Sequence, residues 1–487
     1  MDDSNELLAV RRAKVDRLRE LGAEPFGRAF PNVTASGKIL AEFAEDRAVR
    51  CAGRVVAHRD MGKSHFLHLQ DADGKLQIYV QTKTLPERER ELFKLVDLGD
   101  FIGVDGTLFV TRTGEKTVKV SGLTFLSKAL RPPPGKYHGL QDVEQRYRQR
   151  YLDLISNPEV RRTLTLRSQI VAETRRLLQE QDFLEVETPM MQAVAGGAAA
   201  QPFVTRHHAL NMELFLRIAP ELYLKRLLVG GYDKVFELNR NFRNEGISRK
   251  HNPEFTMLEA YWAYADYEQM ANLVEELITH LAEKFCGGPV LRHPRRDADG
   301  QVIGEKVIDL TRPWPRKKYR DCLTEVAGAD WFTISAGERR ARAEQLGVEL
   351  IPGLADFEVT NQVYEKLVEA RTMNPLFVTH LPKELVPLAK QNADDDSVVD
   401  VYELVINGQE ISPGYSELND PVVQRQRLEH QAGGEPQKLD EDFLTALEHG
   451  MPPAGGLGLG IDRLVMLLTG AESIRDVILF PLMKAKN

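Results

Sequence analysis

The segment 232–261 holds the residues best suited to chemistry, because polar side chains alternate along two predicted strands. Alternate side chains of a strand share a face. One face of the first strand therefore carries Glu237, Asn239, Asn241, Arg243 and Glu245. The loop 246–253 adds His251, and the returning strand aligns Phe255, Met257, Glu259 and Tyr261. Guanidinium groups bind phosphates and aromatic rings pack on bases, so this hairpin predicts a purine-nucleotide site. The alternative is a solvated edge hairpin with surface salt bridges.

A second predicted hairpin, 398–418, brings two carboxylates together. Asn407-Gly408 is a strong two-residue turn signal, and this turn would place Glu403 and Glu410 on one face as diagonal neighbours. Carboxylate oxygens without a nearby His or Cys favour Mg²⁺, which typically also binds substrate phosphates. A helical stripe with a spacing of seven residues, ending at Glu417, is the alternative. The glycines and the proline at 408, 413 and 414 argue against that helix.

The glycine-rich run 455–460 precedes Asp462 and Arg463. Glycines allow a ligand to approach the backbone closely, and Arg463 could reach its phosphates. A tightly packed turn from strand to helix would look similar. Neither a phosphate-binding loop nor a dinucleotide fingerprint is present, because their glycine spacing is not matched at 57–64 or 456–463.

The residues named above lie on predicted strands that follow one another along the chain, with helices outside them. This order predicts an α+β fold with an antiparallel sheet. The segment 49–127 contains five short strands and one helix, as in an OB-fold β-barrel. We therefore expect an N-terminal helical arm at 1–45, an OB-fold at 46–130 and a linker at 131–155. A catalytic domain at 156–487 would contain a helical insertion at about 266–375.

Composition excludes several classes of protein. The 487 residues are 42% hydrophobic and 28% charged, as in an ordinary globular protein. The N-terminus lacks a signal peptide and no apolar run is long enough to span a membrane, so we expect a cytoplasmic protein. The only cysteines, Cys51, Cys286 and Cys322, form no close pair, which argues against a structural zinc site. A net charge of −8 argues against a uniformly basic nucleic-acid-binding protein. Basic residues do gather at 11–19, where the chain forms either a solvated helix or an arm that contacts a phosphate backbone.

Three longer motifs together resemble the class II aminoacyl-tRNA synthetases, most closely the lysine-specific members. FLEVETPMMQ is similar to motif 1, VFELNRNFRNEGIS with HNPEFTMLEAY to motif 2, and GLGLGIDRL with SIRDVILFP to motif 3. RIAPELYLKRLLVGG and GYSELND are typical of the lysine-specific group. The resemblance runs from about residue 50 to the end. It implies an anticodon-binding OB-fold and a homodimer with Pro189 near the interface. It also implies activation of L-lysine by ATP to lysyl-adenylate, with release of pyrophosphate. Transfer to the 3′ end of tRNA(Lys) would then release AMP.

The resemblance also implies roles for individual residues. Catalysis would rest on Arg243 and Arg463, and ATP would be bound by Arg243, Glu245, His251, Phe255 and Arg463. Lysine would be bound by Gly197, Glu221, Arg243, Tyr261 and Glu417. Two to three Mg²⁺ ions would accompany ATP, with Glu403 and Glu410 as ligands. The anticodon would be read by Arg59, Phe66, Gln77 and Glu115.

Two departures from the family pattern fall in the expected amino-acid pocket. Ser412-Pro413-Gly414 replaces a Gly-Asn-Gly common in bacterial relatives, and Val386-Pro387-Leu388-Ala389 replaces Ser-Pro-Leu-Ala. Two alternatives remain: a lysylating paralogue that acts on a non-tRNA acceptor, which would usually lack the barrel, and a non-catalytic RNA-binding paralogue, which would lack the arginines and glutamates.

Overall fold

The computed structural model describes residues 3–485 except 135–139, 199, 297–300 and 433–438. The chain divides into two compact units. The first comprises Met1–Val143 and Tyr151–Asn157, and the second comprises Glu144–Arg150 and Pro158–Asn487. None of the helices in the described ranges has the length and apolarity that a membrane span requires.

The first unit is built on a closed five-stranded barrel with the strand order β1-β2-β3-β5-β4, which confirms the predicted OB-fold architecture. Its strands are β1 (Ala48–Asp60), β2 (Ser64–Gln70), β3 (Lys75–Gln81), β4 (Phe101–Val110) and β5 (Lys116–Ser127). Alternate residues such as Leu67 and Leu69 fill the interior, so the intervening side chains of each strand face outward. The helices are α1 (Asp3–Glu20), α2 (Ser36–Ala41) and α3 (Glu87–Lys94).

Helix α1 is part of the barrel unit rather than a separate arm. Leu18 is fully buried in the barrel core, and Arg11 donates to the carbonyl oxygens of Ala129 and Leu98 at 2.7 and 3.1 Å. Lys14 pairs with Asp97 at 2.7 Å. These two basic residues of the 11–19 cluster therefore stabilise the barrel. The expected linker contains two short helices, α4 (Val143–Arg148) and α5 (Arg150–Ser156).

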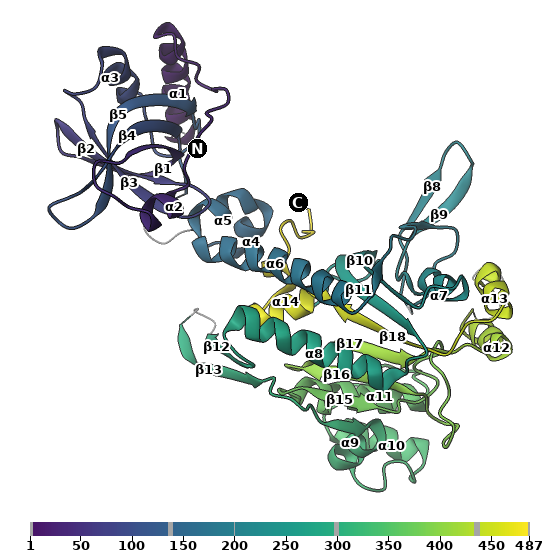
Figure 1. The fold of residues 1–487 in the computed structure, drawn as a ribbon. Helices are drawn as coiled ribbons and strands as arrows, with labels where there is room; N and C mark the ends of the chain where they lie inside the picture. The colour runs from purple at the N-terminus through teal and green to yellow at the C-terminus, as the bar shows by residue number, and fades with distance from the viewer. Residues whose placement is uncertain (1–2, 135–139, 199, 297–300, 433–438, 486–487) are drawn as a thin grey trace. The chain divides into compact units, whose positions relative to one another are not determined.

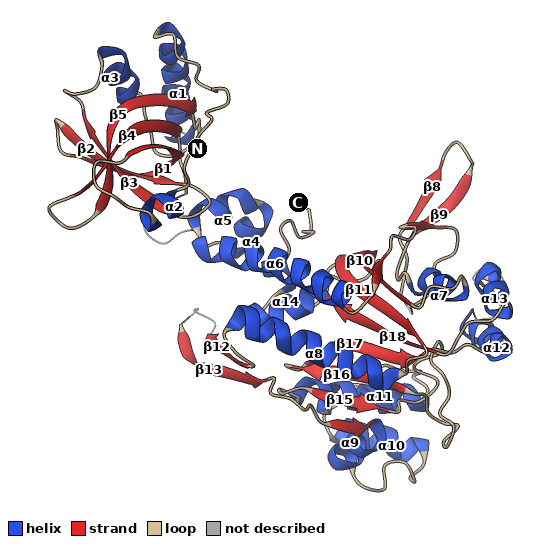
Figure 2. Ribbon diagram, viewed as in Figure 1, coloured by secondary structure: helices blue, strands red, loops and turns tan. Residues whose placement is uncertain are grey.

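The second unit is centred on an eight-stranded sheet with the order β14-β15-β16-β17-β18-β11-β10-β6 (Figure 2). Its pairs are antiparallel except at the two edges, where β14 with β15 and β10 with β6 run parallel. The strands of the sheet are β6 (Leu184–Glu185), β10 (Lys234–Phe242), β11 (Glu254–Ala263), β14 (Arg316–Lys318), β15 (Leu376–Thr379), β16 (Val401–Ile406), β17 (Gln409–Ser416) and β18 (Ala454–Gly460). A small sheet is formed by β7 (Met191–Gln192), β8 (Val204–His207) and β9 (Met212–Leu216).

Helices cover both faces of the large sheet. One face packs on α6 (Pro158–Glu180), α8 (Tyr267–Cys286) and α14 (Ile461–Thr469) (Figure 1). Parts of the other face pack on α7 (Glu221–Val229), α9 (Tyr319–Ala327), α11 (Asp356–Leu367) and α13 (Glu441–Glu448). The remaining helices are α10 (Ala336–Gln345), α12 (Pro421–Ala432), α15 (Ile474–Val477) and the 3₁₀ helix η1 (Glu369–Arg371).

The expectation of a helical insertion over 266–375 is wrong for much of that range. Helix α8 is a core element, since Met270, Leu277 and Leu281 lie in the main hydrophobic cluster under the sheet. The segment also contains the hairpin of β12 (Val290–Arg296) and β13 (Val302–Asp309), and the edge strand β14. The apolar face of α8 predicts that the helix is buried, but it does not show which element the helix packs against.

Candidate functional site

The site lies on the sheet face opposite α8, and strand alternation explains which residues reach it. Leu404, Leu258 and Leu457 belong to the cluster beneath the sheet. Their neighbours on the same strands, such as Glu403 and Gly456, therefore face the other way. They line a cavity of about 410 Å³. All residues assigned to ATP, lysine or Mg²⁺ line this cavity: Gly197, Glu221, Arg243, Glu245, His251, Phe255, Tyr261, Glu403, Glu410, Glu417 and Arg463.

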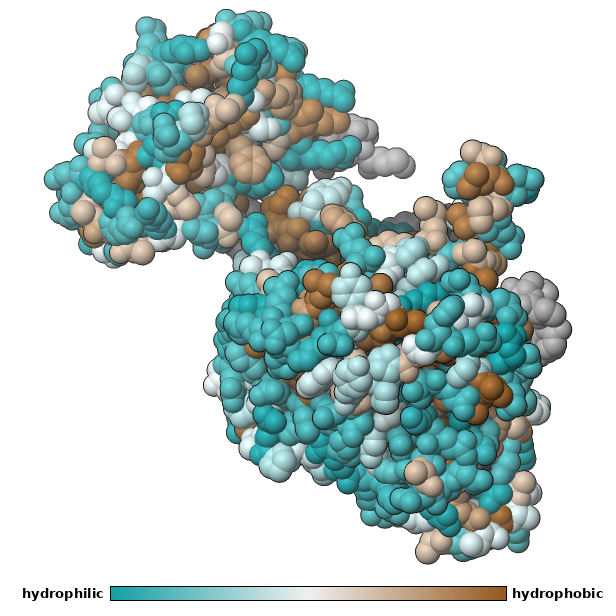
Figure 3. All heavy atoms as spheres, turned by 45° about the vertical axis from the view of Figure 1, so that its right-hand side comes forward, coloured by the Kyte–Doolittle hydropathy of each residue, from teal (hydrophilic) through white to brown (hydrophobic). Residues whose placement is uncertain are grey.

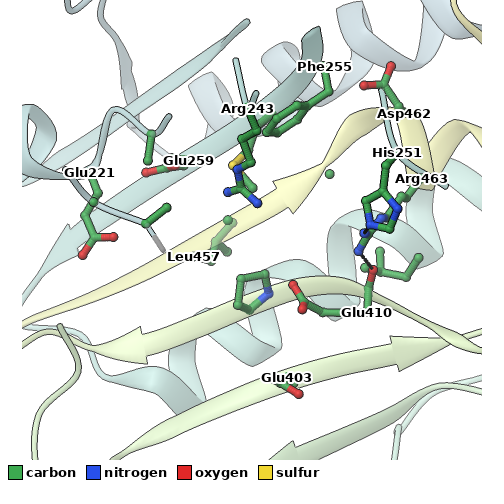
Figure 4. A pocket seen from close by; sticks show the side chains of 18 of the residues that line it. Glu221, Arg243, His251, Phe255, Glu259, Glu403, Glu410, Leu457, Asp462 and Arg463 are labelled. Atoms are coloured by element: carbon green, nitrogen blue, oxygen red, sulfur yellow. Dashed lines mark hydrogen bonds between the residues drawn. The ribbon is translucent and has the colours of Figure 1, made fainter. Parts of the chain in front are cut away.

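One part of the cavity is cationic and aromatic (Figure 4). The Arg243 guanidinium carbon lies 5.1 Å from the centroid of the Phe255 ring. Arg463 donates to the Glu410 carbonyl oxygen at 2.7 Å and lies 3.3 Å from Nε2 of His251. Burial and the Arg463 charge lower the pKa of His251, so its imidazole is neutral at neutral pH. This part of the cavity can accept an anion with a planar ring attached.

The first strand of the motif 2 hairpin is not a solvated edge. β10 lies between β11 and β6, and Glu237 is buried and pairs with buried Arg217 at 2.7 Å. Thr188 Oγ1 donates to the second Glu237 oxygen at 2.6 Å. Glu237 thus stabilises β10 through buried contacts. Of the five residues predicted to share the polar face, only Arg243 and Glu245 line the cavity.

Carboxylates gather beside the cationic part. Val405 pairs with Glu410 as the Asn407-Gly408 turn predicts, but Leu404 pairs with Ser412, so Ile411 is an extra residue in a β-bulge. Burial and repulsion by Glu410 raise the pKa of Glu403 to about 8. Glu369 lies close enough for one of its oxygens to accept from the Glu410 backbone N–H at 3.2 Å. Among described residues, no group of three or more His, Cys, Asp or Glu side chains is arranged to hold a metal ion alone.

The opposite part of the cavity is lined by carboxylates, with Lys225 buried behind them. Lys225 Nζ lies 2.8 Å from Glu221 Oε1 and 2.5 Å from Glu417 Oε2. Tyr261 donates its hydroxyl to Glu259 at 3.0 Å. Burial, followed by the Glu221 charge, raises the pKa of Glu259 to about 8. A pocket with this lining suits an ammonium group and disfavours a carboxylate.

Glycines shape this part of the cavity. Gly197 has φ +87°, and a Cβ there would lie 3.2 Å from the Cβ atoms of Ala219 and Glu221. A Cβ on Gly456 would clash with Glu417 Oε1 and would lie 2.7 Å from Cε1 of Tyr261. Gly456 therefore keeps the space beside the Glu417 carboxylate open.

On the barrel, three of the residues assigned to the anticodon lie on the neighbouring strands β1, β2 and β3, and Glu115 lies in the turn before β5. Arg59 pairs with Phe66 across β1 and β2, and the Phe66 ring lies 5.0 Å from the ring of Tyr79. Gln77 is buried and donates to Thr117 at 2.8 Å, whereas exposed Glu115 lies 3.2 Å from His68. Arg59, Phe66 and Glu115 combine an aromatic ring with hydrogen-bonding groups, which suits unstacked bases.

Sequence reasoning missed three residues that support the site. Lys225 follows Glu221 by one helical turn, a spacing that could have signalled the pair. Glu259 was placed on the correct face but given no role. Asp462 accepts from the Thr256 backbone N–H at 2.8 Å and pairs with Arg167 at 2.5 Å, so it anchors the start of α14 beside Arg463.

Comparisons with known proteins agree with this geometry. Residues 142–484 match a family model described as tRNA synthetases class II (D, K and N), and residues 49–126 match one described as an OB-fold nucleic acid binding domain. The chain is 51% identical to a lysine–tRNA ligase of Carboxydothermus hydrogenoformans over 492 residues, covering 99% of each protein. It is 50% identical to one of Pelotomaculum thermopropionicum, covering 100% of this chain and 96% of the relative. It is 46% identical to one of Bacillus cereus, covering 100% and 99%.

Proposed function

Because the chain belongs to the class II tRNA synthetases, we propose that it joins L-lysine to tRNA(Lys) in two ATP-dependent steps. The observation that carries the choice of lysine is the pair of buried carboxylates, Glu221 and Glu417, at one part of the cavity. The family model also covers enzymes of the D and N groups. A side-chain carboxylate there would meet like charges with no solvent to screen them.

In the first step, the lysine carboxylate attacks the α-phosphate of ATP, a P–O bond forms, and the bond to pyrophosphate breaks. Arg243 stabilises the charge on the α-phosphate and on the lysine carboxylate, while Phe255 stacks on adenine and Glu245 contacts its edge. His251 and Arg463 bind the distal phosphates. Catalysis then consists of orientation and charge stabilisation, without a protein nucleophile. In the second step, the 3′-terminal ribose hydroxyl of the tRNA attacks the activated carbonyl and AMP leaves.

Mg²⁺ fits the carboxylate cluster, because two hard oxygen donors that repel one another are relieved by a divalent cation. Glu403 and Glu410 would hold it together with phosphate oxygens, and two to three ions would neutralise the triphosphate when bound. The lack of a three-ligand protein site among the described residues agrees with binding that depends on ATP.

The barrel favours tRNA as the acceptor, because Arg59, Phe66, Gln77 and Glu115 offer stacking and hydrogen bonds to anticodon bases. A homodimer in the cytoplasm is also part of the proposal. The exposed residues Pro189 and Met191 precede the projecting β8–β9 hairpin, which carries exposed Val204, Leu210 and Met212. Figure 3 shows apolar side chains on this projection, a surface that suits contact with a second copy.

The test is ATP–pyrophosphate exchange with each standard amino acid in turn. Lysine should stimulate exchange strongly, and aspartate and asparagine should have little effect. Exchange driven by aspartate in place of lysine would overturn the proposed substrate. Charging of tRNA(Lys) by the same preparation tests the acceptor separately.

A further inference from the structure

A buried cation of the protein itself, Lys225, lies behind the lysine-binding part of the cavity. The Lys225 side chain is fully buried, and its ammonium group lies near three acceptors: Glu221 Oε1 at 2.8 Å, Glu417 Oε2 at 2.5 Å and the Leu388 carbonyl oxygen at 3.4 Å. Glu221 and Leu388 accept hydrogen bonds from Lys225, and Glu417 Oε2 is its ion-pair partner. Lys225 does not line the cavity among the described residues. It lies behind the two carboxylates.

The three acceptors come from three separate segments. Glu221 is on the same helix, α7, one turn before Lys225. Glu417 follows β17, and Leu388 lies in the segment that departs from the family pattern at Val386. A β-bridge between Ala389 and Glu417 joins the backbone of the 386–389 segment to the end of β17. One ammonium group therefore fixes the relative positions of α7, the end of β17 and the 386–389 loop.

Glu417 is left with one oxygen for another cation. Its Oε2 forms an ion pair with Lys225. Both oxygens are buried without a hydrogen bond in the described part of the chain, but Oε1 lacks an ion-pair partner there as well. Oε1 points to the space that Gly456 leaves open beside the Tyr261 ring. A buried carboxylate oxygen without a donor is costly, and an ammonium group on a ligand would satisfy it.

We propose that Lys225 is a positioning residue that determines specificity for lysine; this inference rests on the proposed function. It holds the Glu221 and Glu417 carboxylates in place and leaves one oxygen of Glu417 for the side-chain ammonium of the substrate. Lys225 balances one of the two negative charges, so the Glu221–Lys225–Glu417 group retains a charge of about −1 when all three are ionised. A single ammonium group neutralises that remainder, and an uncharged side chain does not.

The surrounding charges support this arrangement. Burial raises the pKa of Glu417 to about 8; the Lys225 charge lowers the pKa and so limits this rise, and the Glu221 charge adds to it. Burial lowers the pKa of Lys225, but the two carboxylates outweigh burial and raise it. Tyr261 on β11 and Tyr415 on β17 also face Glu417, and burial raises the pKa of both hydroxyls, so they remain neutral. Lys225 is thus the cation that opposes protonation of Glu417 before lysine arrives.

The experiment compares Lys225→Met with the wild-type enzyme in ATP–pyrophosphate exchange. The KM for lysine should rise by about 100-fold, because removing one partner of a buried charge pair is strongly unfavourable. The KM for ATP should change by less than about threefold, because the ATP contacts lie in another part of the cavity. Preference for lysine over norleucine, which lacks the ammonium group, should fall by about tenfold or more. The half-maximal pH of kcat/KM for lysine should rise by about one unit, as Glu417 becomes harder to ionise.

Two further variants separate positioning from stability. Lys225→Arg keeps the charge and should restore most of the selectivity against norleucine. Lys128→Met is the matched control, because Lys128 is equally buried in the barrel between Asp97 and Asp100 at 2.6 and 2.7 Å. This control should leave the exchange reaction unchanged. If Lys225→Met does not fold, Lys225→Gln takes its place, since it removes the charge but keeps N–H donors.

The outcomes are distinct. A folded, uncharged variant with wild-type KM for lysine and wild-type selectivity would overturn the role of Lys225. An equal loss of kcat/KM for lysine, ATP and norleucine, with an unshifted pH profile, would also overturn this role. That result is expected if the ion pair is purely structural. If lysine fails to stimulate exchange by the wild-type enzyme, the proposed function itself is wrong.

Discussion

The guanidinium group of Arg243 lies beside the ring of Phe255, with 5.1 Å between the guanidinium carbon and the ring centroid. Asn241 pairs with Phe255 across β10 and β11, and Arg243 extends the same face just beyond the end of β10. The alternation of two adjacent strands thus places a guanidinium group next to an aromatic ring, as the proposed ATP site requires.

This relationship predicts the effect of Arg243→Ala. ATP–pyrophosphate exchange should fall by at least about 100-fold, because a charged donor aimed at the reacting phosphate acts mainly in the transition state. Binding of tRNA(Lys), measured by filter retention, should change little, since the proposed anticodon contacts are on the barrel. Retained exchange in a folded Arg243→Ala variant would refute the proposed role.

The carboxylate cluster predicts a change in the dependence on magnesium. In Glu403→Gln or Glu410→Gln, the Mg²⁺ concentration that gives half-maximal exchange should rise by about 10-fold or more, as expected for loss of a metal ligand. Glu365→Gln is the control, because Glu365 accepts from Asn361 at 2.8 Å and does not line the cavity among the described residues. An equal shift in all three variants would show that general charge repulsion, not ligation, is responsible.

Much of the site could be predicted because strand alternation is local. The side chains of Glu403, Phe255 and Tyr261 reach the cavity as their positions along the strands require. The Asn407-Gly408 turn also fixed the pairing of Val405 with Glu410. For these residues, the position along the strand is enough to predict which face the side chain occupies, whichever strands lie next to it.

Other features depend on contacts between distant segments. Glu410 and Glu417 are seven residues apart and would face opposite ways in a regular strand, but the bulge at Ile411 brings both to the cavity. Lys225 meets Glu417 only because α7 packs near the end of β17. Hydrophobic periodicity likewise showed that α8 has a buried face but not that the face packs on the central sheet. None of these facts is encoded in one local pattern.

Glu259 predicts a pH dependence of stability. Its pKa is about 8 in the folded chain against an ordinary value of 4.5, so folding favours its protonated form. That stabilisation is complete below about pH 4.5 and is lost as the pH rises through about 8. Glu259→Gln resembles the protonated form and should remove this loss. Thermal unfolding should give the variant a Tm at least ~2 °C above the wild type at about pH 9, and a smaller advantage at about pH 5. A constant difference at both pH values would contradict the assigned proton.

The position of Phe66 on the barrel predicts that its loss affects tRNA charging but not amino-acid activation. In Phe66→Ala, kcat/KM for tRNA(Lys) charging should fall by about 10–100-fold, the cost of one lost base–aromatic stack. Lysine-dependent exchange should be unchanged, because it does not require the anticodon. Phe101→Ala, at an exposed Phe elsewhere on the barrel that packs with Arg54, should leave charging intact. Loss of charging in both variants would indicate damage to the barrel rather than lost stacking.

Gly456 and Gly458 offer a matched pair of glycines on one strand, two residues apart on the same face. A Cβ on Gly456 would clash with Glu417 Oε1, whereas a Cβ on Gly458 would meet Met257 and Pro413 at 3.5 and 3.6 Å, which is ordinary contact. Gly456→Ala should therefore raise the KM for lysine by at least about 10-fold, because the carboxylate must move or the ammonium site is filled. Gly458→Ala should raise it by less than about threefold. Steady-state exchange with varied lysine measures both, and equal effects of the two methyl groups would contradict the placement of the lysine ammonium beside Glu417.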